Sequence, residues 1–327
     1  MSASPVLPWQ GAQWTRLWRA RETGHLPHAL LLRGPAGVGK QDFAERLAAG
    51  LLCQAPGDEG APCGRCRSCR LRLADTHPDL RRIAPPEPGK AITVDRVRAF
   101  CDHNISRPQL GEHQLVLLHP AEAMNSAAAN AFLKTLEEPV GDAVLILASS
   151  NPERLPATIR SRCQALDFPA PGATPEVLAW LAGDADQAAI ALAVCAGAPL
   201  RARAQLDAAR LERRARALTS WLAVARRRAD PVAVAEEWLT LDDDWLSLWW
   251  RGWLLDLAAL AVSAAPPRLF NPDRRDDLQA LAKTLDLARL HRLLDQVARL
   301  ATELARQLNR QLLFERLLIE STTLQRG

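Results

Sequence analysis

Short apolar runs alternate with helical patterns through the first half of the chain. Apolar runs predict buried strands at residues 29–33, 114–118 and 143–148, and we expect a fourth strand at 164–168. Apolar residues spaced three or four apart predict helices at 40–53, 93–104 and 125–138. Pro139 ends the last of these helices, because proline cannot continue one. Strands that alternate with helices predict an α/β domain with a parallel sheet over residues 1–168.

The pattern changes after residue 168. A linker rich in proline and glycine begins at Pro169, and nearly all of the chain beyond it has helical periodicity. We expect a short helical segment up to residue 206, followed by longer helices at 208–228, 231–264, 274–284 and 286–324. The expected domains are therefore 1–168, a small helical domain at 169–206 and a helical bundle at 207–327.

Composition narrows the class of protein. The 327 residues are 48% hydrophobic with a net charge of +4, which suits two or three domains and does not indicate a nucleic-acid tail. The N-terminus lacks the basic and apolar regions of a secretory signal. Arg251 and Asp256 interrupt the longest apolar stretch, which therefore cannot span a membrane. We expect a cytoplasmic protein without a membrane segment, in which clustered cysteines are metal ligands rather than disulfides.

A phosphate-loop motif follows the first predicted strand. Gly34, Gly39 and Lys40 match G-x-x-x-x-G-K, and Gly37 lies between them; the glycines turn backbone N–H groups toward a phosphate and the lysine reaches it. The motif makes these four residues candidates for binding ATP or ADP. The alternative interpretation is a loop that survives only as a tight turn.

The residues that handle magnesium in an active ATPase are missing. Gln41 replaces the Ser or Thr whose hydroxyl binds Mg²⁺. His119 and Pro120 follow the strand at 114–118, where an active enzyme carries acidic residues, and Glu122 lies three residues too late to replace them. The sequence therefore predicts a subunit that neither binds Mg²⁺ nor hydrolyses ATP.

Four cysteines come soon after the phosphate loop. Cys53 is followed by Cys63, Cys66 and Cys69, the last three separated by two residues each. Two-residue spacers let a turn present adjacent thiolates to one ion, and four thiolates suit tetrahedral Zn²⁺. The spacing predicts a closed, structural zinc module at 53–69. Free thiols and an iron–sulfur cluster are the alternatives.

Arg162 lies between the third and fourth predicted strands. An arginine at such an edge either forms a surface ion pair or reaches the γ-phosphate held by a neighbouring subunit. The residue type alone does not decide between these interpretations.

The motifs together resemble the bacterial clamp-loader subunits of DNA polymerase III, which are AAA+ ATPases. The resemblance rests on the phosphate loop, the cysteines and the runs THPD at 76–79, NAFLKTLEEP at 130–139, PERL at 152–155 and SRC at 161–163. The match is dense over residues 8–168 and thinner beyond. Loss of the magnesium-binding acids makes the chain similar to the delta-prime subunits rather than to the ATP-hydrolysing gamma/tau subunits.

The resemblance implies an AAA+ domain, a lid at 169–206 and an oligomerisation collar at 207–327. It implies an open pentamer with gamma/tau and delta subunits that loads the sliding clamp onto primed DNA. Arg162 would then act in trans on the nucleotide of an adjacent gamma/tau subunit. Where active relatives carry a sensor arginine, this chain has Leu200, with Arg201 one residue late.

Two other functions compete with this interpretation. The first is an active AAA+ ATPase of the gamma/tau type, against which Gln41 and His119 argue. The second is a zinc-dependent DNA-binding protein, whose basic surface would comprise Arg65, Arg67, Arg70 and Arg72. The tryptophans at 238, 245, 249, 250 and 253 are predicted to pack within the helical bundle rather than to stack on bases.

Overall fold

The computed structural model describes residues 5–87, 89–104, 108–137, 142–304 and 309–325. It divides into two compact units, Met1–Pro171 and Gly172–Gly327. The predicted linker lies at this division. The further boundary predicted near residue 206 stays a prediction.

The first unit is built on a parallel sheet of five strands in the order β2-β3-β4-β1-β5. The strands are β1 (Ala29–Arg33), β2 (Leu80–Ile83), β3 (Gln114–Leu118), β4 (Ala143–Ser149) and β5 (Gln164–Asp167). All four predicted strands are confirmed. The edge strand β2 was not predicted, because Arg81 and Arg82 interrupt its apolar run.

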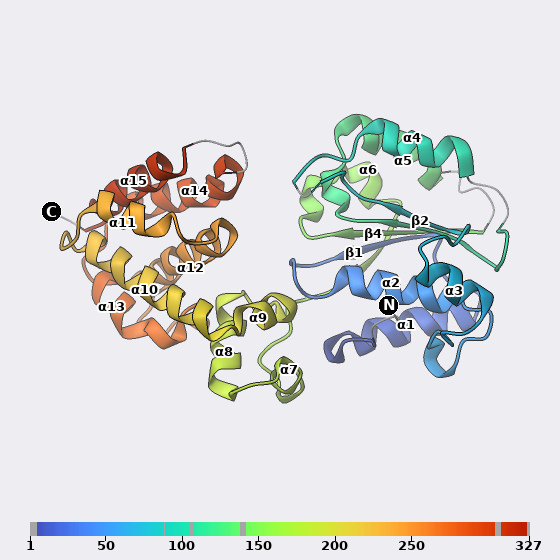
Figure 1. Ribbon diagram of the computed structural model, residues 1–327, viewed down its shortest axis with the longest axis horizontal. Helices are drawn as coiled ribbons and strands as arrows, with labels where there is room; N and C mark the ends of the chain where they lie inside the picture. The colour runs from blue at the N-terminus through green and yellow to red at the C-terminus, as the bar shows by residue number, and fades with distance from the viewer. Residues whose placement is uncertain (1–4, 88, 105–107, 138–141, 305–308, 326–327) are drawn as a thin grey trace. The chain divides into compact units, whose positions relative to one another are not determined.

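Helices cover both faces of this sheet, as Figure 1 shows. One face carries α1 (Gly11–Glu22), α2 (Lys40–Leu52) and α3 (Arg67–Leu73), and the other carries α4 (Val94–Asn104), α5 (Ser126–Glu137) and α6 (Ala157–Arg160). Alternate strand residues serve the two cores: Leu30 packs with Trp14 and Phe43, whereas Leu31 packs on the other side with Phe132. The predicted end of α5 at Glu138 and Pro139 lies outside the described residues. The predicted α/β fold with a parallel sheet is confirmed.

The second unit consists of helices joined by loops, with no strand among its described residues. Its helices are α7 (Pro175–Leu181), α8 (Ala185–Val194), α9 (Pro199–Gln205), α10 (Ala208–Ala225), α11 (Pro231–Trp238), α12 (Asp243–Val262), α13 (Arg275–Ala282), α14 (Leu287–Leu304) and α15 (Arg310–Ser321). No single helix in the described part of the chain is long and apolar enough to cross a membrane; by length and composition alone, α7 and α8 reach that threshold as a pair bent by 97°.

Two of the long predicted helices are wrong, because each is interrupted by a capping residue. The helix expected at 231–264 divides into α11 and α12, where the Asp242 carboxylate accepts the N–H groups of Asp244 and Trp245 at 3.1 Å. The helix expected at 286–324 divides into α14 and α15, where Asn309 accepts the N–H of Leu312 at 3.2 Å. Such side chains satisfy the free N–H groups of a helix start and so favour a new helix.

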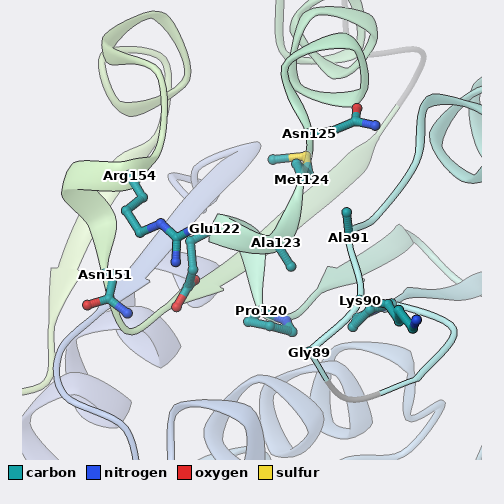
Figure 2. Close-up of a pocket in the computed structure, with 11 residues that line it drawn as sticks. Gly89, Lys90, Ala91, Pro120, Glu122, Ala123, Met124, Asn125, Asn151 and Arg154 are labelled. Carbon is teal, nitrogen blue, oxygen red and sulfur yellow. The ribbon is translucent and has the colours of Figure 1, made fainter. Parts of the chain in front are cut away.

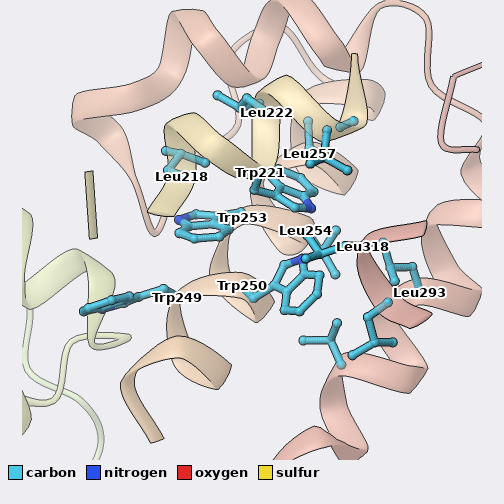
Figure 3. Packing of buried hydrophobic residues seen from close by; sticks show 14 of the residues in the cluster. Leu218, Trp221, Leu222, Trp249, Trp250, Trp253, Leu254, Leu257, Leu293 and Leu318 are labelled. Atoms are coloured by element: carbon cyan, nitrogen blue, oxygen red, sulfur yellow. The ribbon is translucent and has the colours of Figure 1, made fainter. Parts of the chain in front are cut away.

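Tryptophans form the centre of the second unit (Figure 3). Trp221, Trp238, Trp250 and Trp253 are fully buried, and the Trp238 and Trp250 rings meet edge to face with centroids 4.8 Å apart. Trp245 is half-buried and carries the guanidinium of Arg210 4.8 Å from its ring centroid. The prediction that these residues pack within the bundle is confirmed.

Candidate functional site

The phosphate loop joins β1 to α2 in a geometry that requires glycine. Gly37 and Gly39 have φ values of 84° and 86°, in the left-handed region that favours glycine. A Cβ on Gly34 would lie 2.0 Å from the carbonyl oxygen of Phe168, so a side chain there would collide with the end of β5. The loop therefore keeps the backbone of a phosphate-binding turn.

The side chain of Lys40 folds back onto the phosphate loop. Its Nζ donates to the carbonyl oxygens of Gly34 and Pro35, both at 2.7 Å, and to Ser150 Oγ at 3.1 Å. These three bonds account for all three protons of the ammonium group. The side chain is only 4% exposed, and burial lowers the Lys40 pKa to about 8 against the opposing charge of Glu122. The ammonium group that would contact a phosphate therefore already has all its hydrogen-bond partners within the protein.

The N-terminal segment holds the same loop from outside. Trp9 Nε1 donates to the Val38 carbonyl at 2.9 Å. Gln10 Nε2 donates to the carbonyls of Val38 and Gly39, also at 2.9 Å. The two side chains fasten the loop in one conformation. The sequence carries no pattern that links them to residues nearly thirty positions away.

The positions that would handle magnesium carry no carboxylate. Gln41 and His119 line one small cavity beside β3. The Nδ1 atom of His119 is buried without a hydrogen-bond partner, and burial lowers the pKa of this side chain. An uncharged histidine and a carboxamide do not supply the ligands that Mg²⁺ prefers.

Glu122 lies closer to the phosphate loop than its sequence position indicates. A turn at Ala121–Ala123 directs the carboxylate back, so that Oε1 accepts the N–H of Ser150 at 2.9 Å. Ser150 in turn accepts a hydrogen bond from Lys40. Glu122 lies three residues beyond the position where an active ATPase carries an acid, yet the turn brings its carboxylate close to the phosphate loop. Its described contacts there are structural.

A pocket of about 450 Å³ opens at the carboxyl ends of β2, β3 and β4, the edge where α/β proteins bind ligands. Its polar lining consists of Lys90, Glu122, Asn125, Asn151 and Arg154, shown in Figure 2. Sequence reasoning did not find this pocket, because its residues come from three separate loops.

The four predicted zinc ligands come together. Their Sγ atoms all lie within 4.8 Å of one another, and those of Cys53 and Cys69 are 3.7 Å apart. Zinc–sulfur bonds of about 2.3 Å place tetrahedral thiolates at about 3.8 Å from each other, so the cluster fits one Zn²⁺. These residues would hold the ion in a closed site, where it supplies folding free energy rather than catalysis.

Backbone N–H groups prepare the sulfur atoms for a metal. The N–H groups of Cys63, Cys66 and Cys69 each donate, at 3.3 Å, to the sulfur of the preceding ligand. Hydrogen bonds from the backbone of Arg65 and Cys66 lower the pKa of the Cys63 thiol to about 6. Burial raises the pKa of Cys69 to about 12, a cost that a bound cation offsets.

Tryptophans of α1 support the cysteine module. Trp14 and Trp18 stack with ring centroids 5.9 Å apart, and Trp14 Nε1 donates to the carbonyl of Glu59 at 2.8 Å. Gly60 lies against the Trp18 ring. The loop between Cys53 and Cys63 is therefore fastened to the domain independently of any metal.

Arg162 projects from the end of α6 and is 38% exposed. Its Nη2 lies 2.8 Å from Glu137 Oε1, and its Nη1 donates to the Thr158 carbonyl at 3.0 Å. Both interpretations of this residue remain compatible with these contacts, because an ion pair within the chain leaves part of the guanidinium free.

Comparisons with known proteins identify the family. A family model described as DNA polymerase III, delta subunit, matches residues 9–172, and one for the C-terminal part of the delta subunit matches residues 208–323. DNA polymerase III subunit delta' of Pseudomonas aeruginosa is 38% identical over 98% of both chains. That of Yersinia pestis is 35% identical over 98% of this chain and 96% of its own. The chain belongs to the DNA polymerase III delta' family.

This delta' family member also has more distant relatives. DNA polymerase III subunit tau of Escherichia coli is 35% identical over 46% of this chain and 23% of its own. A solved gamma subunit-related protein of Thermotoga maritima covers 96% of this chain and all of its own, at 18% identity and a TM-score of 0.48. The similarity to tau is confined to less than half of the chain, whereas that to delta' extends over nearly all of it.

Proposed function

We propose that the protein is a non-hydrolysing stator of the DNA polymerase III clamp loader and that it supplies Arg162 in trans. In this role it assembles with gamma/tau and delta subunits in the cytoplasm and helps to load the sliding clamp onto primed DNA. The helical parts at 169–206 and 207–327 serve as lid and collar. Family membership supports the assembly, and the geometry of the phosphate loop supports the absence of hydrolysis.

The contacts of Lys40 carry the proposal. Hydrolysis needs a lysine on the β and γ phosphates, a hydroxyl and a carboxylate on Mg²⁺, and a group that orients water. Here the ammonium donates to Gly34, Pro35 and Ser150, and residues 41 and 119 are Gln and His. ATP or ADP would have to displace those three hydrogen bonds to reach Lys40, so we infer weak nucleotide binding and no turnover.

A chain without turnover can still contribute to a neighbour's reaction. Arg162 is exposed at a helix end, and a guanidinium can neutralise the charge that develops on a transferred phosphoryl group. The zinc module is assigned a structural role, since its four sulfur atoms leave no ligand position open.

Two assays test this function. The purified subunit should show no Mg²⁺-dependent ATP hydrolysis above that of its Lys40→Ala variant, with or without DNA. In the reconstituted complex, Lys40→Ala should leave clamp-stimulated hydrolysis unchanged, whereas Arg162→Ala should reduce it. Turnover by the isolated subunit that Lys40→Ala abolishes would instead identify an active ATPase of the gamma/tau type.

A native pull-down separates the remaining alternative. A clamp-loader subunit should co-purify with gamma/tau and delta subunits, and mass spectrometry of the complex should show one copy in a pentamer. A protein that binds DNA through Arg65, Arg67, Arg70 and Arg72 would instead be recovered without those subunits, and replacing the four arginines by Ala would release it from DNA.

A further inference from the structure

Arg162 and Glu137 come from the ends of two helices that lie on the same face of the sheet. Glu137 is the last described residue of α5, and Arg162 follows Ser161, the C-cap residue of α6. The ion pair joins Nη2 to Oε1 at 2.8 Å, and both side chains remain partly exposed, at 38% and 48%. The pair therefore lies at the surface, where a second protein chain has access to it.

The contacts of Arg162 use only part of its hydrogen-bonding capacity. A guanidinium has five N–H donors in one plane. Nη1 donates to the Thr158 carbonyl at 3.0 Å and to Ser161 Oγ at 3.5 Å, and Nη2 pairs with Glu137. Both terminal nitrogens are therefore held, while the Nε–H and one N–H of Nη2 have no partner among the described contacts. Two fixed nitrogens determine the plane of the whole group, which an arginine bound through a single contact does not achieve.

We propose that Glu137 is a positioning residue, which orients the Arg162 guanidinium so that its free N–H groups meet a phosphate on the neighbouring subunit. The inference rests on the proposed function of Arg162. A long side chain loses considerable rotamer freedom when it docks on a partner. The ion pair with Glu137 restricts the rotamers of Arg162 before the subunits meet, so the side chain already has the orientation in which it would contact the neighbour's nucleotide.

The same segment provides a matched control. Arg160 forms an ion pair with Glu153, which is similarly acidic and more exposed at 83%. Both pairs join an arginine of the segment after β4 to a nearby glutamate. Only the pair of Glu137 involves the proposed finger. Glu153→Ala therefore removes a comparable surface charge and ion pair without touching Arg162.

The experiment measures ATP hydrolysis by the reconstituted clamp loader with sliding clamp and primed DNA. Four variants are compared with the wild type: Glu137→Ala, Glu137→Gln, Arg162→Ala and Glu153→Ala. Glu137→Ala should lower kcat by about two- to fivefold, the range that a half-exposed ion pair supports. KM for ATP should not change, because the finger acts in the transition state. Glu137→Gln keeps an acceptor oxygen and should recover most of the rate, and Glu153→Ala should match the wild type.

A double variant connects the effect to Arg162. If Glu137 acts through the arginine, Glu137→Ala combined with Arg162→Ala should be no slower than Arg162→Ala alone. If Arg162→Ala slows hydrolysis but Glu137→Ala equals or exceeds the wild-type rate, the positioning role is wrong and the finger stands. If Arg162→Ala itself has no effect, the proposed function of Arg162 fails, and the role of Glu137 fails with it.

Discussion

Ser68 Oγ and His77 Nε2 lie 2.7 Å apart in the interior of the first unit. The N–H of Asp79 donates to the other ring nitrogen of His77, so Nδ1 is an acceptor and Nε2 carries the proton. Ser68 Oγ also donates to the carbonyl of Leu52, at 2.5 Å. This chain of hydrogen bonds joins the end of α2, the cysteine module and the approach to β2 through one neutral imidazole.

The neutral His77 predicts a dependence of stability on pH. Burial lowers its pKa below the ordinary value of 6.5, so between the two values the unfolded chain binds the additional proton. The free energy of unfolding should therefore be fully retained above pH 6.5 and fall below it. One linked proton limits the fall to about 1.4 kcal/mol per pH unit.

Urea denaturation of the wild type and His77→Asn checks this. Asn keeps an acceptor for the Asp79 N–H and does not titrate, so the difference between the two proteins excludes effects of acid on the metal site, which both share. That difference should shrink between about pH 7.5 and about pH 5.5. A difference that stays constant over this interval would mean that folding does not change the pKa of His77.

The cysteine cluster predicts one tightly bound zinc ion per chain. Metal analysis of freshly purified protein should give about one equivalent, as a closed site of four thiolates requires. Cys66→Ser should remove the ion and lower the free energy of unfolding by about 4 kcal/mol or more, because metal affinity contributes to folding. Cys163→Ser, at a buried cysteine outside the cluster, should keep the full zinc content. Iron and acid-labile sulfide in place of zinc, or four free thiols, would contradict the assignment.

Gly60 predicts a sharp steric limit in the loop between Cys53 and Cys63. Its φ is +74°, and a Cβ there would lie 2.4 Å from the Trp18 ring. Gly60→Ala should therefore lower stability by about 2–4 kcal/mol, through backbone strain and overpacking. Gly57 is the control, since its φ is −78° and the nearest atom to a Cβ would be 3.7 Å away. Thermal unfolding should detect the first substitution and little change from Gly57→Ala; equal effects would place the constraint elsewhere.

Local patterns predict much of this fold. Uninterrupted apolar runs identify β1, β3 and β4, because strands buried on both faces need no polar alternation. The edge strand β2 escapes that rule, since Arg82 pairs there with Glu45 at 2.6 Å instead of packing in the core. The break between α11 and α12 is not predicted either, because the helical periodicity continues across it and a single capping aspartate, Asp242, starts the new helix.

The candidate sites divide in the same way. The cysteine ligands and the phosphate-loop glycines are predictable because their chemistry depends on spacing within a short segment. The hydrogen bond from Lys40 to Ser150, the one from Trp9 to the loop and the ion pair of Arg162 are not predictable, because each joins segments far apart in the sequence. Such contacts depend on the order of the strands in the sheet, and the periodicity of single segments does not predict that order.

The second unit contains a buried polar network centred on Asp256. Asp256 is 1% exposed and accepts the N–H groups of Phe270 at 2.7 Å and Asn271 at 2.8 Å. The Asn271 side chain also donates to Asp256 at 2.7 Å, and its oxygen accepts from the buried Arg214 at 2.7 Å. Arg214 is paired with Asp273 at 2.8 Å. The carboxylate thus closes a network that fastens the segment after α12 to α10.

Asp256→Asn should disrupt this network although the change is small in size. In either orientation, the new amide directs its NH₂ group at a backbone N–H that needs an acceptor. A buried donor left unsatisfied costs about 1–3 kcal/mol, and we expect the free energy of unfolding to fall by that amount. Asp244→Asn, at an exposed position of the same helix, should change it by less than about 0.5 kcal/mol. Urea denaturation of the two variants measures the difference, and equal stabilities would show that the Asp256 carboxylate is not required by its neighbours.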